Sequence, residues 1–320
     1  MSKPQVLMPT PMMDLIVDQL DETFTLHKLW EAADPEAEIA ALADRIDAVA
    51  TGGKRPVDAE LMRRLPNLKI VANFGVGYDS VDAAWAGEHD IYVTNTPDVL
   101  TEEVADTTLG LLLMTVRQLS ETERYLRAGR WVKEGPFPLT RQTLRERKVG
   151  ILGLGRIGKA VATRLEAFGC EIAYHGRRKQ EDVSYRYYAD LREMAGDVDI
   201  LISVAPGGPE THHMISTEVL NALGPDGIVI NVGRGTVIDE AALIAALREE
   251  RIFSAGLDVF EKEPEVPAEL IAMERVVLLP HVGSASIHTR GLMGQLLVDN
   301  LKQFFETGKP ITPVAETPLR

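Results

Sequence analysis

Cysteine is almost absent from this chain: Cys170 is the only one among 320 residues. A single thiol can form no internal disulfide and no cysteine metal cluster, so neither contributes to stability. One cysteine near the start of an apolar run is ordinarily a small core residue. The composition fits a reducing compartment, and we expect a cytoplasmic protein without a metal site.

Signals for export or membrane insertion are missing as well. The N-terminal segment MSKPQVLMPT has no basic-then-apolar pattern of a signal peptide. The most apolar helical stretch, residues 109–116, is too short to span a bilayer. We therefore expect neither a secreted nor a membrane protein.

Positive charge is scarce. The chain has 34 Lys and Arg against 48 Asp and Glu, a formal net charge of −14. No basic stripe offsets this excess, which argues against sequence-independent binding to nucleic acid. A small anionic ligand would need a local cationic pocket, and we expect such a small-molecule partner.

What the chain does have is a regular alternation of short apolar runs and helical patterns. Its length allows two domains, each with its own core. Strand–helix alternation is typical of parallel sheets covered by helices on both faces. We therefore predict an α/β fold with two doubly wound parallel sheets. The expected strands are 6–8, 24–29, 48–50, 70–74 and 91–93 in the first sheet, and 149–152, 171–174, 200–204, 228–232, 254–259 and 276–279 in the second.

A glycine-rich stretch, Lys148 to Ala160, organises the second sheet. Gly153, Gly155 and Gly158 have G-x-G-x-x-G spacing between an apolar run and a helical pattern. The first glycine permits a tight turn, the second lets backbone approach a pyrophosphate, and the third lets the helix pack on the strand. Three spaced glycines are weak evidence alone, but this context favours a dinucleotide site over a merely structural turn.

The next expected strand ends in His175-Gly176-Arg177-Arg178, where the adenosine ribose should lie. In sites for NAD an acidic residue about 20 residues after the first glycine binds the 2′-hydroxyl. This chain has no carboxylate there, and two arginines follow instead. Because a guanidinium suits a 2′-phosphate, we predict NADP(H) in preference to NAD(H). The alternative is that both arginines form a solvated face.

The run Asn73–Asp79 ends another expected strand in a glycine turn. Ligands of open α/β sheets bind outside the carboxyl ends of the strands. The backbone N–H groups of Val76 and Gly77 are therefore candidates to hold a substrate anion. A tight turn without a ligand is an equal alternative.

Three segments connect or extend these sheets. We predict a helix after Pro97 with Thr101 as its N-cap, buried between the domains. Residues 120–147 look polar and irregular, and we expect them to pack on a partner subunit, with packing on their own chain as the alternative. A final helix over 287–306 is expected to pack back on the first domain, which would make that domain discontinuous.

Three late segments, 231–235, 256–264 and 280–286, follow strand ends and should converge on one cleft. They would bring together Arg234, a carboxylate and His281. These groups suffice for ketone reduction: the arginine clamps a substrate carboxylate, the histidine supplies the proton, and the carboxylate orients the ring. Singly each has an ordinary structural role; together, beside a nucleotide turn, they favour an active site.

The segments NFGVGYDSVD, GILGLGRIG, NVGRGTVIDEAAL, GLDVFEKEP and LLPHVGSAS resemble the D-isomer-specific 2-hydroxyacid dehydrogenase family over nearly the whole chain. The resemblance implies a catalytic trio of Arg234, Glu263 and His281, with Val76 and Gly77 on the substrate carboxylate. It implies a Rossmann cofactor domain, 100–286, inserted in a flavodoxin-like catalytic domain, 1–99 and 287–320, in a homodimer joined through 100–147. The cofactor positions it implies, besides Gly153, Gly158 and the segment 175–178, are Thr108, Gly155, Arg156, Ile157, Val204, Pro206, Thr211, Val232, Asp258 (on the nicotinamide amide) and Gly283.

The departure from the family is at the second strand end, where many members carry aspartate. YHGRRK is similar to the NADPH-preferring glyoxylate/hydroxypyruvate reductases, so we expect reduction of short 2-oxo acids to D-2-hydroxy acids. A 2-ketogluconate or aryl-pyruvate reductase is the alternative. From another class, a nucleotide-sensing scaffold like the family's corepressor relatives remains open. A formate dehydrogenase is disfavoured, since that group pairs its histidine with glutamine and this chain has Glu263.

Overall fold

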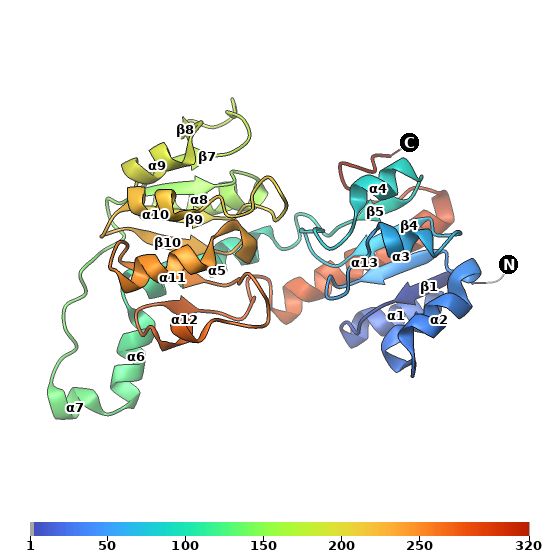
Figure 1. Cartoon of the computed structure of the whole chain (residues 1–320), viewed down its shortest axis with the longest axis horizontal. Coiled ribbons are helices and arrows are strands. Elements are labelled where there is room, and N and C mark those ends of the chain that lie inside the picture. The colour runs from blue at the N-terminus through green and yellow to red at the C-terminus, as the bar shows by residue number, and fades with distance from the viewer. Residues whose placement is uncertain (1–2, 320) are drawn as a thin grey trace. The chain divides into compact units, whose positions relative to one another are not determined.

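The computed structural model describes residues 3–319, which divide into two compact units. The terminal unit holds the chain up to Leu100 together with the residues from Ser286 onward. The central unit spans Thr101–Ala285. Figure 1 labels the elements of both, and each unit is described by itself. In the described part of the chain, no helix combines the length and the apolarity needed to cross a bilayer.

The terminal unit contains a five-stranded parallel sheet in the order β2-β1-β3-β4-β5. All five strands coincide with the apolar runs predicted from the sequence. Every residue of β3 and β4 is buried, as expected for the middle of a parallel sheet covered on both faces. The strands are β1 (Gln5–Met8), β2 (Thr25–Lys28), β3 (Ala48–Thr51), β4 (Ile70–Asn73) and β5 (Tyr92–Thr94).

Helices from both chain ends cover this sheet. The carboxylates of Asp34, Asp58 and Asp82 cap three of the helices by accepting backbone N–H groups. The long C-terminal helix α13 packs against α1 and β4, and it ends where Gly308 adopts a φ of 79°. The helices are α1 (Asp14–Thr23), α2 (Pro35–Leu42), α3 (Ala59–Arg63), α4 (Ala83–Glu88) and α13 (Ile287–Thr307), the last of which was predicted over 287–306.

The central unit contains a seven-stranded parallel sheet in the order β12-β11-β10-β9-β6-β7-β8. The first six of these strands along the chain, β6 to β11, lie in the order of a dinucleotide-binding sheet. The prediction of six strands was wrong by one, because it missed β8. That strand is three residues long, lies at the sheet edge and carries one charge and two tyrosines, so it has no apolar run to reveal it. The strands are β6 (Lys148–Leu152), β7 (Glu171–His175), β8 (Arg186–Tyr188), β9 (Ile200–Ser203), β10 (Ile228–Asn231), β11 (Ser254–Leu257) and β12 (Val277–Leu278).

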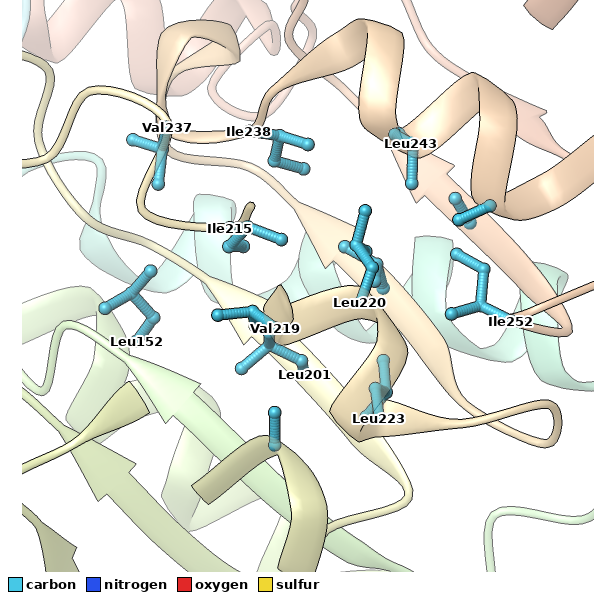
Figure 2. Packing of buried hydrophobic residues seen from close by; sticks show 14 of the residues in the cluster. Leu152, Leu201, Ile215, Val219, Leu220, Leu223, Val237, Ile238, Leu243 and Ile252 are labelled. Carbon is cyan, nitrogen blue, oxygen red and sulfur yellow. The ribbon is translucent and has the colours of Figure 1, made fainter. Parts of the chain in front are cut away.

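Two apolar layers enclose this sheet. On one face, Figure 2 shows Leu220 and Leu243, from two helices, in one apolar layer with Leu201 of β9. On the other face Leu111 and Leu165 belong to a second layer. The helices of the unit are α5 (Thr101–Val116), α6 (Leu119–Arg127), α7 (Arg130–Glu134), α8 (Arg156–Ala167), α9 (Leu191–Asp197), α10 (Thr217–Leu223), α11 (Glu240–Arg248) and α12 (Ala268–Ala272).

Two local predictions for this unit need correction. Thr101 is the first residue of α5 and not the cap before it. Residues 120–147 are not irregular throughout, since they include most of α6 and all of α7, which project from the sheet before a long loop returns to β6 (Figure 1). Helix α6 is amphipathic and buries Tyr125, which explains why a polar stretch folds as a helix. Trp131 and Val132 remain 60% and 94% exposed, so the expected packing on a partner stays a prediction.

Candidate active site

The glycine turn lies between β6 and α8. Gly153 adopts a φ of 95°, which favours glycine. A Cβ on Gly158 would overlap the carbonyl oxygen of Gly153, so the helix start packs directly on the turn. A Cβ on Gly155, in contrast, would meet no atom within 4 Å. The protein itself requires the outer glycines, while the middle one faces open space, as a site for a pyrophosphate needs.

The helix that follows offers anion-binding groups at its start. Arg156 and Ile157 are its first residues, and N–H groups in a first turn have no acceptor within their own helix. The helix dipole adds partial positive charge at this end. The turn therefore fits a dinucleotide phosphate sterically and electrostatically.

The segment beyond β7 fits a phosphate on the adenosine ribose. His175 ends the strand, and its Nδ1 lies 3.0 Å from the carbonyl oxygen of Tyr188. Gly176 follows it with open space around its Cα. Arg177 and Arg178 come next, and both are exposed. Two guanidinium groups are thus available beside the end of the strand that adjoins β6.

The other expected cofactor positions follow neighbouring strands. Val204 follows β9, and Val232 follows β10, which pairs with β9. The hydroxyl of Thr211 donates to the carbonyl of Pro206 at 2.7 Å and closes the loop between them. Thr108 differs: it is fully buried, and its hydroxyl bonds within its own helix, so its side chain packs in this structure and presents no surface to a ligand.

Glu263 and His281 are in direct contact. Oε2 of Glu263 lies 2.7 Å from Nδ1 of His281. Glu263 comes from the loop after β11, and His281 follows β12, the strand beside it. Arg234 follows β10, on the other side of β11. The structure thus places the three predicted catalytic residues after three adjacent strand ends.

The surroundings of Glu263 favour its ionised form. Burial alone would raise its pKa, but the hydrogen bond with His281, the charge on that ring, a hydrogen bond from the N–H of Phe260 and the charge of Arg234 together lower the pKa below its usual value. The carboxylate is therefore negative at neutral pH.

Asp258 determines the shape of the loop that carries His281. This buried residue accepts the N–H of Val282 at 2.7 Å and the N–H of Gly283 at 2.8 Å, and its carbonyl accepts the N–H of His281. His281 has a φ of 54°, a conformation that is strained for a side chain of this type and is held by these bonds. Burial raises the pKa of Asp258, although the two N–H groups and His281 act against that shift.

This second role of Asp258 was missed in the sequence. The resemblance assigned the residue to the nicotinamide amide and said nothing of the loop. Asp258 and Gly283 are 25 residues apart, and only the pairing of β11 with β12 brings them together. No local signal could have indicated the contact.

Asn231 holds the turn that carries Arg234, and it was also missed. Its side-chain amide donates to the carbonyl of Arg234 at 2.9 Å, and its oxygen accepts the N–H of Gly233 at 3.1 Å. In the terminal unit Asn73 likewise donates to the carbonyl of Gly77 at 2.9 Å. Both asparagines open an Asn-x-Gly-x-Gly sequence after a buried strand, a repeated spacing that could have revealed them.

The turn after β4 has the features of an anion site. Asn95 binds the carbonyl of Val76, and Asn73 binds that of Gly77. Within residues 3–319, neither Val76 nor Gly77 donates its backbone N–H to an acceptor. Two successive N–H groups with fixed carbonyls are a recognised arrangement for binding an anion.

Comparisons with known proteins agree with this geometry. The NAD binding domain of the D-isomer specific 2-hydroxyacid dehydrogenases matches residues 109–283. A hydroxyphenylpyruvate reductase of Plectranthus scutellarioides is 48% identical over 97% of this chain and 98% of its own. A glyoxylate/hydroxypyruvate reductase A of Arabidopsis thaliana is 45% identical over the same shares. A 2-ketogluconate reductase of Gluconobacter oxydans is 38% identical over 98% and 99%.

A solved structure is similar over the full length. The NADPH-dependent glyoxylate/hydroxypyruvate reductase of Sinorhizobium meliloti, in complex with NADP and malonate, has a TM-score of 0.93 and 50% identity. The match covers 100% of this chain and 99% of that one. The α/β architecture predicted from the sequence, with its Rossmann sheet, is therefore confirmed.

Proposed function

The chain belongs to the D-isomer specific 2-hydroxyacid dehydrogenase family, a family of oxidoreductases, and from this premise we propose that it reduces short 2-oxo acids with NADPH. Glyoxylate would give glycolate, and hydroxypyruvate would give a D-2-hydroxy acid. The observation that carries the proposal is the 2.7 Å contact between Glu263 and His281 in the unit that contains the glycine turn.

His281 is the proton donor in this proposal. Its Nδ1 is engaged by Glu263, so Nε2 is the nitrogen that transfers a proton to the substrate oxygen. The negative carboxylate of Glu263 stabilises the charged ring before transfer and fixes its orientation. Asp258 supports the same geometry from the backbone side, because it holds the residues that follow His281.

In this proposal Arg234 of the central unit is a binding group for a substrate carboxylate, and so, in the terminal unit, is the turn of Val76 and Gly77. A guanidinium offers two parallel donors to a carboxylate and polarises the neighbouring carbonyl. The two backbone N–H groups are suited to a carboxylate because they have no acceptor in the described chain. Asn231 and Asn73 keep the two turns in shape. Binding the carboxylate orients the ketone for reduction.

Bound NADPH would supply the hydride. The residues that would hold it are the open Gly155 with Ile157 at the pyrophosphate and Arg177 with Arg178 at the ribose phosphate. The absence of a carboxylate after β7 supports NADPH in preference to NADH. Since Gly155 leaves the space and the arginines supply the charge, the described residues fit the phosphorylated dinucleotide.

The experiment is a panel of 2-oxo acids with the full-length chain. Glyoxylate, hydroxypyruvate, hydroxyphenylpyruvate and 2-ketogluconate are each assayed with NADPH and with NADH, and the chirality of the product is determined. We expect the highest kcat/KM with NADPH and one of the first two acids, and a D product from hydroxypyruvate. An L product or exclusive use of NADH would overturn the proposal.

An aryl-pyruvate reductase is the second candidate, because a relative with 48% identity carries the name hydroxyphenylpyruvate reductase. The same panel decides between the two, since preference for the aromatic acid would support this candidate. A nucleotide-sensing scaffold is the rival from another class. It predicts tight NADPH binding without measurable turnover of any acid in the panel.

We further propose that the central unit binds the dinucleotide, that the terminal unit takes part in substrate binding, and that the protein acts in the cytoplasm as a homodimer. The dimer would be joined through the arm that contains α6 and α7, where Trp131 and Val132 are exposed. Light scattering of the wild type and of a Trp131→Asp, Val132→Asp double variant tests this. We expect the mass of a dimer for the wild type and of a monomer for the variant.

A further inference from the structure

A cluster of metal-binding side chains lies outside the candidate active site. It consists of His212 and His213, in the segment after Thr211, and Glu261, in the loop after β11. Each offers one ligand atom, and these atoms all lie within 4.8 Å of one another. We propose that His212, His213 and Glu261 form a site for one divalent transition-metal ion, with zinc the best match. The inference stands apart from the proposed function.

The spacing of the ligand atoms suits a tetrahedral ion. Nε2 of His213 lies 3.2 Å from Oε1 of Glu261. Bonds of about 2.0–2.1 Å in a tetrahedron place neighbouring ligand atoms roughly 3.3–3.4 Å apart. This pair is therefore already at the distance that coordination requires. A ring nitrogen of the exposed His212 lies within 4.8 Å of both of these ligand atoms.

The backbone brings both histidines to one side. Consecutive side chains of an extended chain point in opposite directions. His213 instead has a φ of 53°, and its ring stacks on that of His212 with centroids 3.8 Å apart. A left-handed conformation is costly for histidine and persists only where the surroundings hold it. The N–H of His213 is held by the carbonyl of Thr236 at 2.9 Å.

The third ligand is positioned in a similar way. The N–H of Glu261 donates to a carboxylate oxygen of Glu240 at 3.4 Å, which fixes its loop against α11. Glu240 thus places a second carboxylate next to Glu261. A cation at this position would offset the repulsion between the two carboxylates.

The donor set selects the ion. Two imidazoles and one carboxylate suit zinc and related transition metals, and leave a fourth position for water. Magnesium and calcium prefer oxygen ligands alone. Because Glu261 is two residues from Glu263, an ion here would connect the loop of Thr211 to the loop that carries the candidate catalytic carboxylate.

The test is titration of the full-length chain, freed of metal, with zinc chloride by calorimetry. We expect one ion per chain with a Kd on the order of 1 µM or tighter. The variants His213→Gln and Glu261→Gln should bind at least tenfold more weakly, and His212→Gln should be weaker than the wild type. Cobalt in place of zinc should give the intense visible absorption of a four-coordinate site in the wild type and not in His213→Gln or Glu261→Gln.

Three controls make the result specific. His288→Gln changes an exposed histidine in α13, and Glu265→Gln changes an exposed carboxylate in the loop of Glu261; both should bind zinc like the wild type. The pair of Glu263 and His281 is the alternative location for the ion. His281→Gln should therefore also retain the ion, since the proposed site does not include His281. Circular dichroism and Tm without metal confirm that each variant is folded. The proposal is wrong if the wild type binds no stoichiometric ion, or if binding survives His213→Gln and is lost in His281→Gln.

Discussion

The Asp258 carboxylate accepts the backbone N–H of Gly283 at 2.8 Å. Asp258 follows β11 and Gly283 lies after β12, so this contact ties two adjacent strand ends together. A Cβ on Gly283 would lie only 3.1 Å from that carboxylate oxygen, which leaves little room for a side chain. His281 lies two residues before Gly283, and its position depends on this contact.

We expect Asp258→Asn to lower kcat more than it changes the affinity for NADPH. An amide retains one acceptor and directs an NH2 group at a backbone N–H, so one buried donor is left unpaired at a cost of about 1–3 kcal/mol. Steady-state kinetics and fluorescence titration of NADPH measure both effects. Asp190→Asn is the matched control, since asparagine can replace this helix cap. Wild-type kcat in Asp258→Asn would refute the positioning role.

Replacing His281 with alanine should reduce kcat by about 10²–10⁴-fold, the usual contribution of a general acid. The Kd for NADPH should change little, because the ring is assigned to proton transfer. His288→Ala, an exposed histidine in α13, should retain wild-type values of both. If turnover and NADPH affinity fall together in His281→Ala, the residue is structural.

The stability contributed by Glu263 should depend on pH. Although burial raises its pKa, the contacts with His281 and the charge of Arg234 bring the pKa below the ordinary value of 4.5. A group whose pKa is lower in the folded chain than in the unfolded chain contributes its full stabilisation at pH values above the unfolded pKa. That contribution is lost as the pH falls through the folded pKa. Glu263→Gln should therefore be less stable than the wild type at neutral pH, and the difference should shrink below pH 4.5.

Urea midpoints at several pH values measure this difference. Glu265→Gln, in the same loop, removes an exposed carboxylate and should show a smaller, nearly constant difference. A wild-type advantage over Glu263→Gln that is the same at every pH would assign the loss to packing and not to charge.

Arg177→Asp should reverse or abolish the preference for NADPH over NADH. The change removes a guanidinium that we propose binds the 2′-phosphate and adds a carboxylate that suits a ribose hydroxyl. Loss of a charged hydrogen bond of about 1.5–3 kcal/mol lowers the ratio of the two kcat/KM values by roughly 10–150-fold. Arg192→Asp makes the same charge change on α9 and should leave the ratio unchanged. An unchanged ratio in Arg177→Asp would rule out the assignment.

The glycine turn allows a paired test of cofactor binding. A Cβ at position 155 meets nothing within 4 Å, so Gly155→Ala should keep the wild-type Tm and lose affinity for NADPH. A Cβ at position 158 overlaps the carbonyl of Gly153, so Gly158→Ala should lower the Tm itself. Thermal melts and NADPH titration separate the effects. If Gly155→Ala binds NADPH like the wild type, the pyrophosphate does not approach this glycine.

Much of the fold was predictable because its signals are local. The buried strands β3, β4, β9 and β10 are continuous apolar runs, and the glycine spacing of the turn is contained within a few residues. The edge strand β8 and the helices α6 and α7 escaped prediction for the opposite reason. β8 has little buried surface, and the two helices have mostly polar sequences of which only Tyr125 in α6 is buried.

The sequence by itself determined the alternation of strands and helices, the glycine turn and the two arginines after β7, because each depends on neighbours along the chain. Only the tertiary structure decided that Glu263 contacts His281 and that Asp258 holds Gly283. These partners are 18 and 25 residues apart, and they meet because β12 pairs with β11 in the sheet. Strand order is a property of the whole packed sheet, since the sequence of one strand does not specify its neighbour.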